Sequence, residues 1–490
     1  MNDTTLRPLP LALLTVLMAA SGGARAAASV AVQCPGDIDG DAVPDRCLFG
    51  VQGGGGPNAN NCKSGPGGAN GNNPAYDPNV RCRHLTAGDG FSAMADGRVQ
   101  YMFGFGDVTA LKDGSLPGTV ADGDIADTVL QKGTLFAHWP APVIAVNQGE
   151  KLYLSLTNVG MLIRPDLFDP HTVHFHGFPN AAAVFDGLPE SGLAIGAAAT
   201  LTYYYDLVEP GTFMYHCHVE ATEHMQMGML GSLYVRAGQN RLPNGTTLGS
   251  WVHTNNGDAD NAPYGDWPNG PGDVDNGVPG VFDEGTHDCY AYNDGDGSTR
   301  YSCNREYHLQ LGGFDPDFHD SSWFVQPLPF ALMKDRYPMI NGRGYPDTIN
   351  PNALATPTDN ENCGGSCNNG VQSQVESSLI TVTKGENALL RLSNLNVTTL
   401  HTLVSPSLPL DVVGIDSREL RTPDGTQPLH YKTNSLTLGG GMAADVVLRT
   451  QDVPAGEYYL YAANLQYLAN NDEPGQPTGG MMTKIVVNNP

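Results

Sequence analysis

The sequence predicts an all-β protein built from two β-sandwich domains. Short strand-like stretches alternate with turns rich in glycine and proline, and no stretch shows the spacing of an amphipathic helix. Residues 141–158, for example, suggest strand, turn and strand, with Leu152, Leu154 and Leu156 at alternate positions. The chain of 490 residues is long enough for two or three domains. We therefore expect strands packed in layers around hydrophobic cores.

The N-terminus has the features of an export signal. An apolar run from Leu9 to Ala20 follows Arg7, and Ala24 and Ala26, on either side of Arg25, form a small-residue cleavage site before Ala27. The run is too short for a membrane-spanning helix, and no later stretch is apolar enough for one. We expect a signal peptide over 1–26 and a mature protein that is periplasmic or secreted.

Residues 27–130 form a predicted N-terminal region with cysteines and a candidate calcium loop. Carboxylates in a tight loop suit calcium, although a plain acidic turn explains them nearly as well; they are Asp37, Asp39, Asp41 and Asp45. Glycine and asparagine dominate residues 52–76, which predicts a surface loop.

The cysteines predict disulfide bonds. If Cys217 is set aside, an even number remains in a chain that we expect to be exported. The remaining residues are Cys34, Cys47, Cys62, Cys82, Cys289, Cys303, Cys363 and Cys367. Sequence does not fix their connectivity, and pairs that are close in sequence are the simplest expectation.

The first predicted sandwich, residues 131–240, contains an unusual strand ending. The strand leads into His216, Cys217 and His218, and His224 follows. Successive side chains of a strand point to opposite faces, so the two histidines beside the cysteine face away from it.

A second strand-like stretch carries three more histidines. His174 and His176 share one face, and His171 lies on the other if the strand is regular. Alternation thus predicts two sites: His171, Cys217, His224 and Met229 in one, and His174, His176, His216 and His218 in the other. A thiolate, two imidazoles and a thioether suit blue copper, and four imidazoles suit copper that binds oxygen. A zinc site or ordinary core residues are the alternatives.

These motifs resemble those of multicopper oxidases of the cupredoxin superfamily. The resemblance runs from about Phe136 to the C-terminus and rests on the motifs at 171–177 and 216–218, with His224 and the Gly-Met pair ending at Met229. Met225 and Met227 are competing thioethers, and Met229 is preferred because the Gly-Met pair resembles that of the family. It implies Greek-key cupredoxin domains, a type 1 copper and an oxygen-reducing type 2/type 3 cluster. One departure is that five residues separate His218 from His224, where the family usually has three.

The resemblance also implies a proton relay. Asp186 follows the first histidine motif in an Asp-Gly-Leu-Pro segment and resembles the family's proton-relay acid. An aspartate that caps a turn is an equally good explanation.

The second half of the chain has no comparable motif. Residues 241–304 are predicted to be an acidic, Gly/Asn-rich insertion, pinned by Cys289 and Cys303. Residues 305–490 resemble the copper-free middle domain of three-domain multicopper oxidases. His401 is the one histidine there in a plausible ligand position, and a structural role explains it more simply.

The ligand count predicts an oligomer. In the family, a trinuclear cluster takes eight histidines, four from each of two domains, whereas this chain supplies one set of four. Two copies that meet across a twofold axis would present the same patch twice. We therefore expect a homo-oligomer with the cluster between subunits.

The resulting hypothesis is an exported copper oxidase that uses oxygen. The net charge of −26 makes nucleic acid and membrane surfaces poor partners and slightly favours a low-valent metal ion, Mn(II) or Fe(II), over a phenol as reductant. A non-enzymatic electron carrier or copper-binding protein is the main alternative. A copper nitrite reductase fits less well, because that family has an aspartate in the place of His174.

Overall fold

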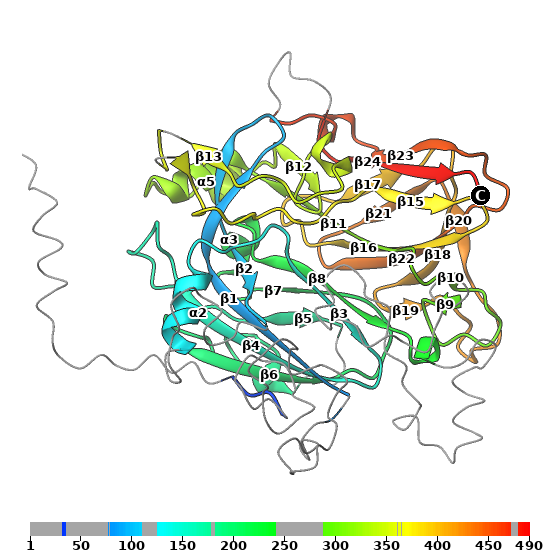
Figure 1. The fold of residues 1–490 in the computed structure, drawn as a ribbon, viewed down its shortest axis with the longest axis horizontal. Helices are drawn as coiled ribbons and strands as arrows, with labels where there is room; N and C mark the ends of the chain where they lie inside the picture. The colour runs from blue at the N-terminus through cyan, green and yellow to red at the C-terminus, as the bar shows by residue number, and fades with distance from the viewer. Residues whose placement is uncertain are drawn as a thin grey trace, which may run out of the picture.

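The computed structural model describes residues 32–35, 77, 79–109, 125–177, 182–241, 288–359, 361–363, 365–471 and 479–490. Strands dominate these residues and form two sandwiches side by side (Figure 1). The all-β prediction is confirmed. The expected signal peptide, the four aspartates of the candidate calcium loop and the loop at 52–76 lie outside the described residues.

The first sandwich consists of two four-stranded sheets. One sheet has the order β2 (Val99–Asp107), β1 (Val80–Ala93), β4 (Lys151–Gly160) and β6 (Thr200–Asp206). The other has the order β3 (Ala141–Asn147), β8 (Leu230–Arg236), β7 (Gly211–His216) and β5 (His174–His176).

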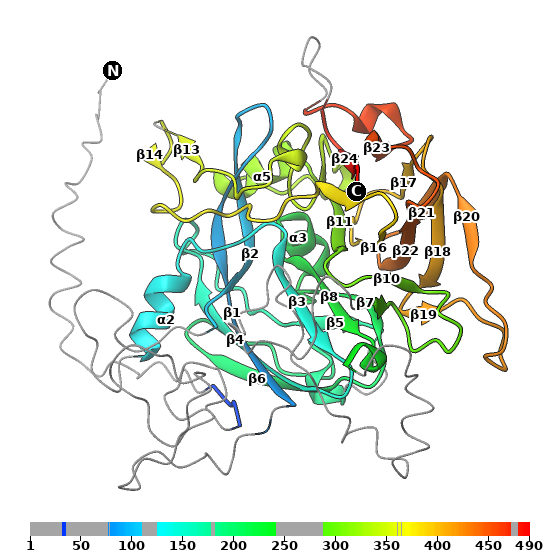
Figure 2. The ribbon, with the colours of Figure 1, turned by 45° about the vertical axis from the view of Figure 1, so that its right-hand side comes forward.

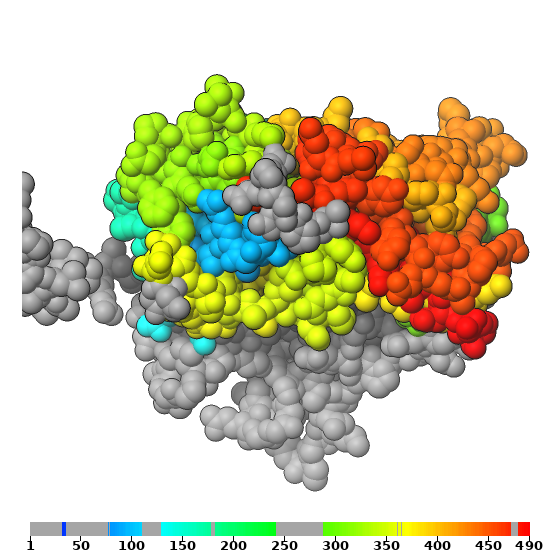
Figure 3. Space-filling model, turned by 90° about the horizontal axis from the view of Figure 1, so that it is seen from above, coloured from blue at the N-terminus to red at the C-terminus, as the bar shows by residue number. Residues whose placement is uncertain are grey.

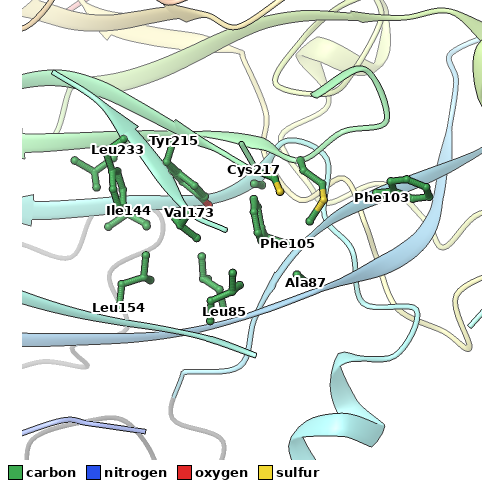
Figure 4. Close-up of a cluster of buried hydrophobic side chains, with 14 of the residues drawn as sticks. Leu85, Ala87, Phe103, Phe105, Ile144, Leu154, Val173, Tyr215, Cys217 and Leu233 are labelled. Atoms are coloured by element: carbon green, nitrogen blue, oxygen red, sulfur yellow. The ribbon is translucent and has the colours of Figure 1, made fainter. Parts of the chain in front are cut away.

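The core of this sandwich lies between the two sheets. Leu85 and Leu154 come from one sheet, and Ile144 and Leu233 from the other; all four are fully buried (Figure 4). Cys217 belongs to the same buried cluster, at the end of β7. The cysteine is therefore held by the core itself and not by a surface loop.

The first sandwich begins earlier than the sequence analysis predicted. That analysis placed residues 80–107 in a separate N-terminal region, but β1 pairs in parallel with β4 and antiparallel with β2. Small and polar residues at 87–90 hide the strand pattern. They are required by close packing, since a Cβ at Gly88 would lie 2.7 Å from the Val159 side chain.

The second sandwich is larger. One sheet runs β12 (Tyr337–Ile340), β11 (Glu306–Phe314), β16 (Asn387–Asn394), β22 (Met442–Arg449), β18 (Leu410–Ile415) and β19 (Arg418–Glu419), with β20 (Tyr431–Thr433) also paired to β18. The other runs β15 (Ile380–Thr383), β24 (Met482–Asn488), β23 (Gly456–Ala462), β17 (His401–Val404) and β21 (Ser435–Leu438).

Short elements complete the described residues. Two hairpins pair β9 (Asp288–Tyr290) with β10 (Arg300–Ser302) and β13 (Thr358–Asp359) with β14 (Gly365–Ser366). The α-helices are α2 (Ile125–Gly133), α3 (Ala221–Gln226) and α5 (Pro316–Trp323). The 3-10 helices are η1 (Ala183–Phe185), η2 (Gly238–Arg241), η4 (Phe330–Leu332), η5 (Asp347–Ile349) and η6 (Leu465–Tyr467).

The two sandwiches share a buried interface, where β7 and β8 approach β11, β16 and β22 (Figure 2). Its polar part centres on Glu306, which lies 2.7 Å from Arg236 of the first sandwich and 2.7 Å from Arg391 of the second. Its apolar part is a cluster of Met94, Met102, Ala137, Trp139, Met214, Leu230, Phe314, Tyr337, Met339, Leu395 and Ala443. The interface therefore fixes how the domains face each other.

The hairpin of β1 and β2 reaches into the second half of the chain. Figure 3 shows its blue tip among the green and yellow segments that follow residue 300. The side-chain amide of Asn368 bonds both the backbone N–H and the carbonyl of Phe91, and Gln374 does the same for Ala93. These two amides satisfy the backbone edge of β1 as a neighbouring strand would.

Three disulfides are present among the described residues. Cys289–Cys303 and Cys363–Cys367 follow the expectation of pairs close in sequence. Cys34 instead pairs with Cys82, 48 residues away, because the N-terminal segment runs back to β1. Cys47 and Cys62 lie outside the described residues. Among the helices that the structure describes, none has the length and apolar character needed to cross a membrane.

Candidate metal centre

The first ligand set surrounds Cys217. The residue directly follows β7, is fully buried and is the free cysteine of the described chain. Its Sγ lies 3.2 Å from Nδ1 of His224 and 3.7 Å from Nδ1 of His171. Met229, also fully buried, is placed beside Cys217 by a 3.1 Å backbone hydrogen bond from the Cys217 N–H.

Two different elements bring the imidazoles to this sulfur. His171 precedes β5 and is fixed by reciprocal backbone hydrogen bonds with Ile195. His224 lies in α3, the short helix that connects β7 to β8. The insertion between His218 and His224 is therefore accommodated by this helix, which still returns His224 to the sulfur.

The pocket around Cys217 favours positive charge. Burial lowers the pKa of His224, but Cys217 and Asp169 outweigh burial and raise this pKa to about 10. The Asp169 carboxylate lies 3.7 Å from Nε2 of His224. The backbone N–H of Thr172 also points at the sulfur, at 3.5 Å.

The second ligand set lies on the opposite face of the same strands. The pairing of β5 with β7 puts His174 opposite His216. Nε2 of His176 lies 3.0 Å from Nε2 of His216, and the ligand atoms of His174, His176 and His216 all lie within 4.8 Å of one another. His218 is adjacent, with its ring centre 5.0 Å from that of His174.

Backbone carbonyls orient the rings of this set. Nδ1 of His174 lies 2.6 Å from the Asp186 carbonyl, and Nδ1 of His216 lies 2.8 Å from the Cys217 carbonyl. Each Nδ1–H donates to its carbonyl, which leaves the Nε2 lone pair free for a metal. Burial lowers the pKa of His216 to about 3 and so keeps this ring in the neutral form that binds metals.

Two cavities open beside these imidazoles, and the second domain forms their far walls. The larger, about 580 Å³, is lined by His176, His216, His218 and Met225 from the first domain and by residues 395–400 and 440–441 from the second. The smaller, about 500 Å³, is lined by His174, Asp186, Asp416, Ser417 and Gly441, among others.

Comparison with known proteins identifies the family. Models described as multicopper oxidase match residues 127–240 and residues 332–489. The chain belongs to the multicopper oxidase family.

Curated multicopper oxidases resemble this one over short stretches. The iron transport multicopper oxidase fetC of Epichloe festucae (strain E2368) is 34% identical over 85 residues, 16% of this chain and 12% of that protein. The multicopper oxidase MmcO of Mycobacterium tuberculosis (strain ATCC 25618 / H37Rv) is 31% identical over 97 residues, 20% of this chain and 17% of that protein. The chain therefore matches less than a fifth of the length of either relative.

A solved structure supports the fold over most of the chain. The crystal structure of the blue copper oxidase from Nitrosomonas europaea has a TM-score of 0.50 and 19% sequence identity, and the match covers 83% of this chain and 86% of that one. At this identity the likeness shows the cupredoxin-type fold alone.

The donor atoms of this multicopper oxidase fit copper. Cys217 has no disulfide partner, and its Sγ lies beside Nδ1 of both His171 and His224, so that the ligand atoms of the three residues lie within 4.8 Å of one another. In the second set, the 3.0 Å between Nε2 of His176 and of His216 matches two cis ligands on one ion, since metal–nitrogen bonds are about 2 Å.

The remaining predicted residues lie in different surroundings. The Asp186 carboxylate lies 3.7 Å from Nδ1 of His174, so it is at the second site, but its carbonyl makes the closer contact. His401 is buried in β17 beside the ring of Tyr467 and is not among the cavity-lining residues.

Sequence reasoning missed three residues at these sites. Asp169, Asp416 and Gly441 carry no motif, and the last two come from the domain without ligands. Only the folded arrangement brings them to the histidines.

Proposed function

We propose that this multicopper oxidase is exported and transfers electrons, one at a time, from a reductant to oxygen. Two ligand sets of different chemistry on opposite faces of the same strand carry this proposal. When bound, copper would supply one-electron chemistry at a type 1 site and reduction of oxygen to water at a type 2/type 3 cluster.

The chain itself connects the two sets. Cys217 belongs to the first set, and its sequence neighbours His216 and His218 belong to the second. The path from the sulfur to either ring consists of the cysteine side chain, one peptide link and a histidine side chain. The hydrogen bond from Nδ1 of His216 to the Cys217 carbonyl adds a second route, at 2.8 Å.

Asp186 is our candidate for proton delivery. Its carboxylate is partly exposed, lines the smaller cavity and lies 3.7 Å from Nδ1 of His174. A carboxyl group between solvent and the imidazoles could carry the protons that oxygen reduction consumes.

We rank a low-valent metal ion, Mn(II) or Fe(II), above a phenol as the reductant. The net charge of −26 attracts cations, and Asp169 places a carboxylate 3.7 Å from the outer nitrogen of His224. The name of one relative, iron transport multicopper oxidase, agrees with this ranking.

We further propose that the trinuclear cluster is completed between subunits. The second-domain residues that line the two cavities include no histidine among those the structure describes, so one chain offers four imidazoles. A partner copy of the first domain would offer four more. Nucleic acid and membranes are not part of this proposal.

Copper content and oligomeric state test the proposal together. The copper-loaded protein should be an oligomer that holds more than one copper per chain and consumes oxygen with Mn(II), Fe(II) or a phenol. Mass by light scattering, metal analysis and an oxygen electrode measure these properties. A monomer that holds one copper and takes up no oxygen would contradict the oxidase and support the electron carrier.

The electron carrier is the second candidate because the described residues of the second domain supply no half of the cluster. A copper nitrite reductase is less well supported, since His174 occupies the position of that family's aspartate. The three disulfides support export. Calcium binding at Asp37, Asp39, Asp41 and Asp45 remains a separate proposal.

A further inference from the structure

A glycine turn of the second domain touches a ligand of the first. Residues 439–441 connect β21 to β22, and Gly441 has a φ of +89°, a conformation that favours glycine. A Cβ on Gly441 would lie 3.2 Å from Cε1 and 3.3 Å from Nδ1 of His176. The backbone of Gly441 is therefore packed directly against this imidazole.

The turn is fixed to its own domain. The Gly441 N–H donates to the Asn394 carbonyl at 2.8 Å, and the Met442 N–H donates to the Gly439 carbonyl at 3.1 Å. Gly440 packs so closely that a Cβ there would lie 2.5 Å from the Asn396 carbonyl oxygen. Because β16 and β22 are central strands of the second sandwich, the turn cannot move without them.

The contact sets the orientation of the His176 ring. The Gly441 turn lies against the edge of the ring that contains Cε1 and Nδ1. Nε2 of the same ring faces Nε2 of His216, 3.0 Å away. The position of the turn therefore limits how the His176 ring can rotate away from His216.

We infer that Gly441 is a positioning residue for the four-imidazole site, through which the second domain holds His176 in its metal-binding orientation. The inference rests on the proposal that these imidazoles bind copper. It gives the second domain a role in metal binding, although none of its described residues belongs to either ligand set. Carbonyls of the first domain orient His174 and His216, whereas His176 is packed against the backbone of the other sandwich.

Glycine substitutions test this role against a matched control. Gly441→Ala adds a Cβ against His176 and strains the backbone, whereas Gly441→Asn adds the Cβ at a smaller backbone cost, because asparagine tolerates this conformation better. Gly370→Ala is the control, since Gly370 has a φ of +92° with no atom within 4 Å of an added Cβ. It imposes the same backbone strain without the contact.

The readouts are copper titration, the blue absorption band and the EPR signal of non-blue copper, so they do not depend on activity. Both Gly441 variants should bind copper at the imidazole site about 10- to 100-fold more weakly, the usual effect of losing a partner of a metal-bound histidine. Their blue band should stay unchanged, and Gly370→Ala should match the wild type in both signals.

Three results would overturn the inference. It fails if the Gly441 variants bind both coppers like the wild type, or if the blue site weakens as much as the imidazole site. It also fails if Gly370→Ala loses the non-blue signal to the same degree. If the wild-type protein binds copper at the blue site alone, the proposed function fails together with the inference. If the wild type binds copper at both sites and only the Gly441 result is wrong, the inference alone fails, so the two failures are distinguishable.

Discussion

Two methionines near His224 have different surroundings. Met229 is fully buried beside Cys217, whereas Met225 lines the larger cavity on the side of the other imidazoles. A weak axial thioether tunes the reduction potential of a blue-copper site. Met229→Leu should therefore raise the potential of the proposed type 1 copper and keep its blue colour, while Met225→Leu should leave the potential unchanged. A redox titration followed at the blue band measures both, and a shift confined to Met225→Leu would reassign the axial ligand.

For single residues, most of the successful predictions from the sequence came from the alternation of side chains along a strand. Alternation along β5 and β7 separates Cys217 from His216 and predicts that His174 and His176 share a face, and the structure places these side chains accordingly. Their roles as copper ligands stay predictions. Gly441 and Asp169 could not be predicted, because each acts at a site through a contact with a residue far away or in another element.

Among the elements, α5 is an insertion of the second half of the chain that packs on the first domain. Its His319 is fully buried, with Nδ1 2.5 Å from the Tyr101 carbonyl and Nε2 2.9 Å from the Gln226 carbonyl. Gln226 ends α3, the helix that carries His224. The imidazole of α5 therefore lies between β2 and α3.

Removal of this imidazole should destabilise the protein. Burial lowers the pKa of His319 to about 4, so the neutral ring has one N–H to donate. His319→Leu leaves a buried carbonyl without this donor, and we expect it to lower the free energy of unfolding by about 1–3 kcal/mol. Ser321→Ala is the control on the same helix, because that hydroxyl is exposed, and it should change stability by less than about 0.5 kcal/mol. Denaturant unfolding followed by tryptophan fluorescence compares them; equal midpoints for both variants would refute the bridging role of His319.

β1 and β2 show why the sequence did not predict the first strands of the first sandwich. β1 and β2 contain glycines at positions where another chain segment lies too close for a side chain, as at Gly104, where a Cβ would lie 2.9 Å from that of Ala137. Such a stretch lacks the alternation of apolar residues by which strands are recognised. The strands of the later domain were easier to predict, since β16 and β22 keep apolar residues at buried positions.

At the scale of the whole molecule, Glu306 ties the two domains together. Burial would raise the pKa of Glu306, but Arg236 and Arg391 outweigh burial and hold it below the ordinary value of 4.5. A depressed carboxyl pKa stabilises the folded state above the unfolded value, and this stabilisation is lost as the pH falls through the folded value. The domain interface should therefore weaken as the pH drops below about 4.5.

The variant Glu306→Gln should show this dependence. At pH 7 it removes the carboxylate partner of two buried guanidinium groups. We expect the free energy of unfolding to fall by about 3–5 kcal/mol. Below pH 4.5 the difference from the wild type should shrink, because the wild-type carboxyl becomes protonated as well. Glu457→Gln, which breaks an exposed pair with Lys484, is the control. Unfolding curves at several pH values measure the difference in free energy of unfolding between the wild type and Glu306→Gln. A difference that does not change with pH would contradict the predicted role of the Glu306 carboxylate.

The way in which the two domains face each other could not be predicted from the sequence. Patterns of apolar residues predicted two sandwiches, but not that the second would line the cavities beside the histidines of the first. That placement depends on Arg236, Glu306 and Arg391, whose charges give no local signal of their partners.

The amides that satisfy the edge of β1 also bear on how the polypeptide matures. Asn368 and Gln374 follow Phe91 and Ala93 by 277 and 281 residues. During synthesis β1 leaves the ribosome before Asn368 and Gln374. The backbone groups of Phe91 and Ala93 can therefore form these hydrogen bonds only after most of the polypeptide has been made. The sandwich that holds Cys217 is therefore finished late, and insertion of its metal is expected to follow the end of synthesis.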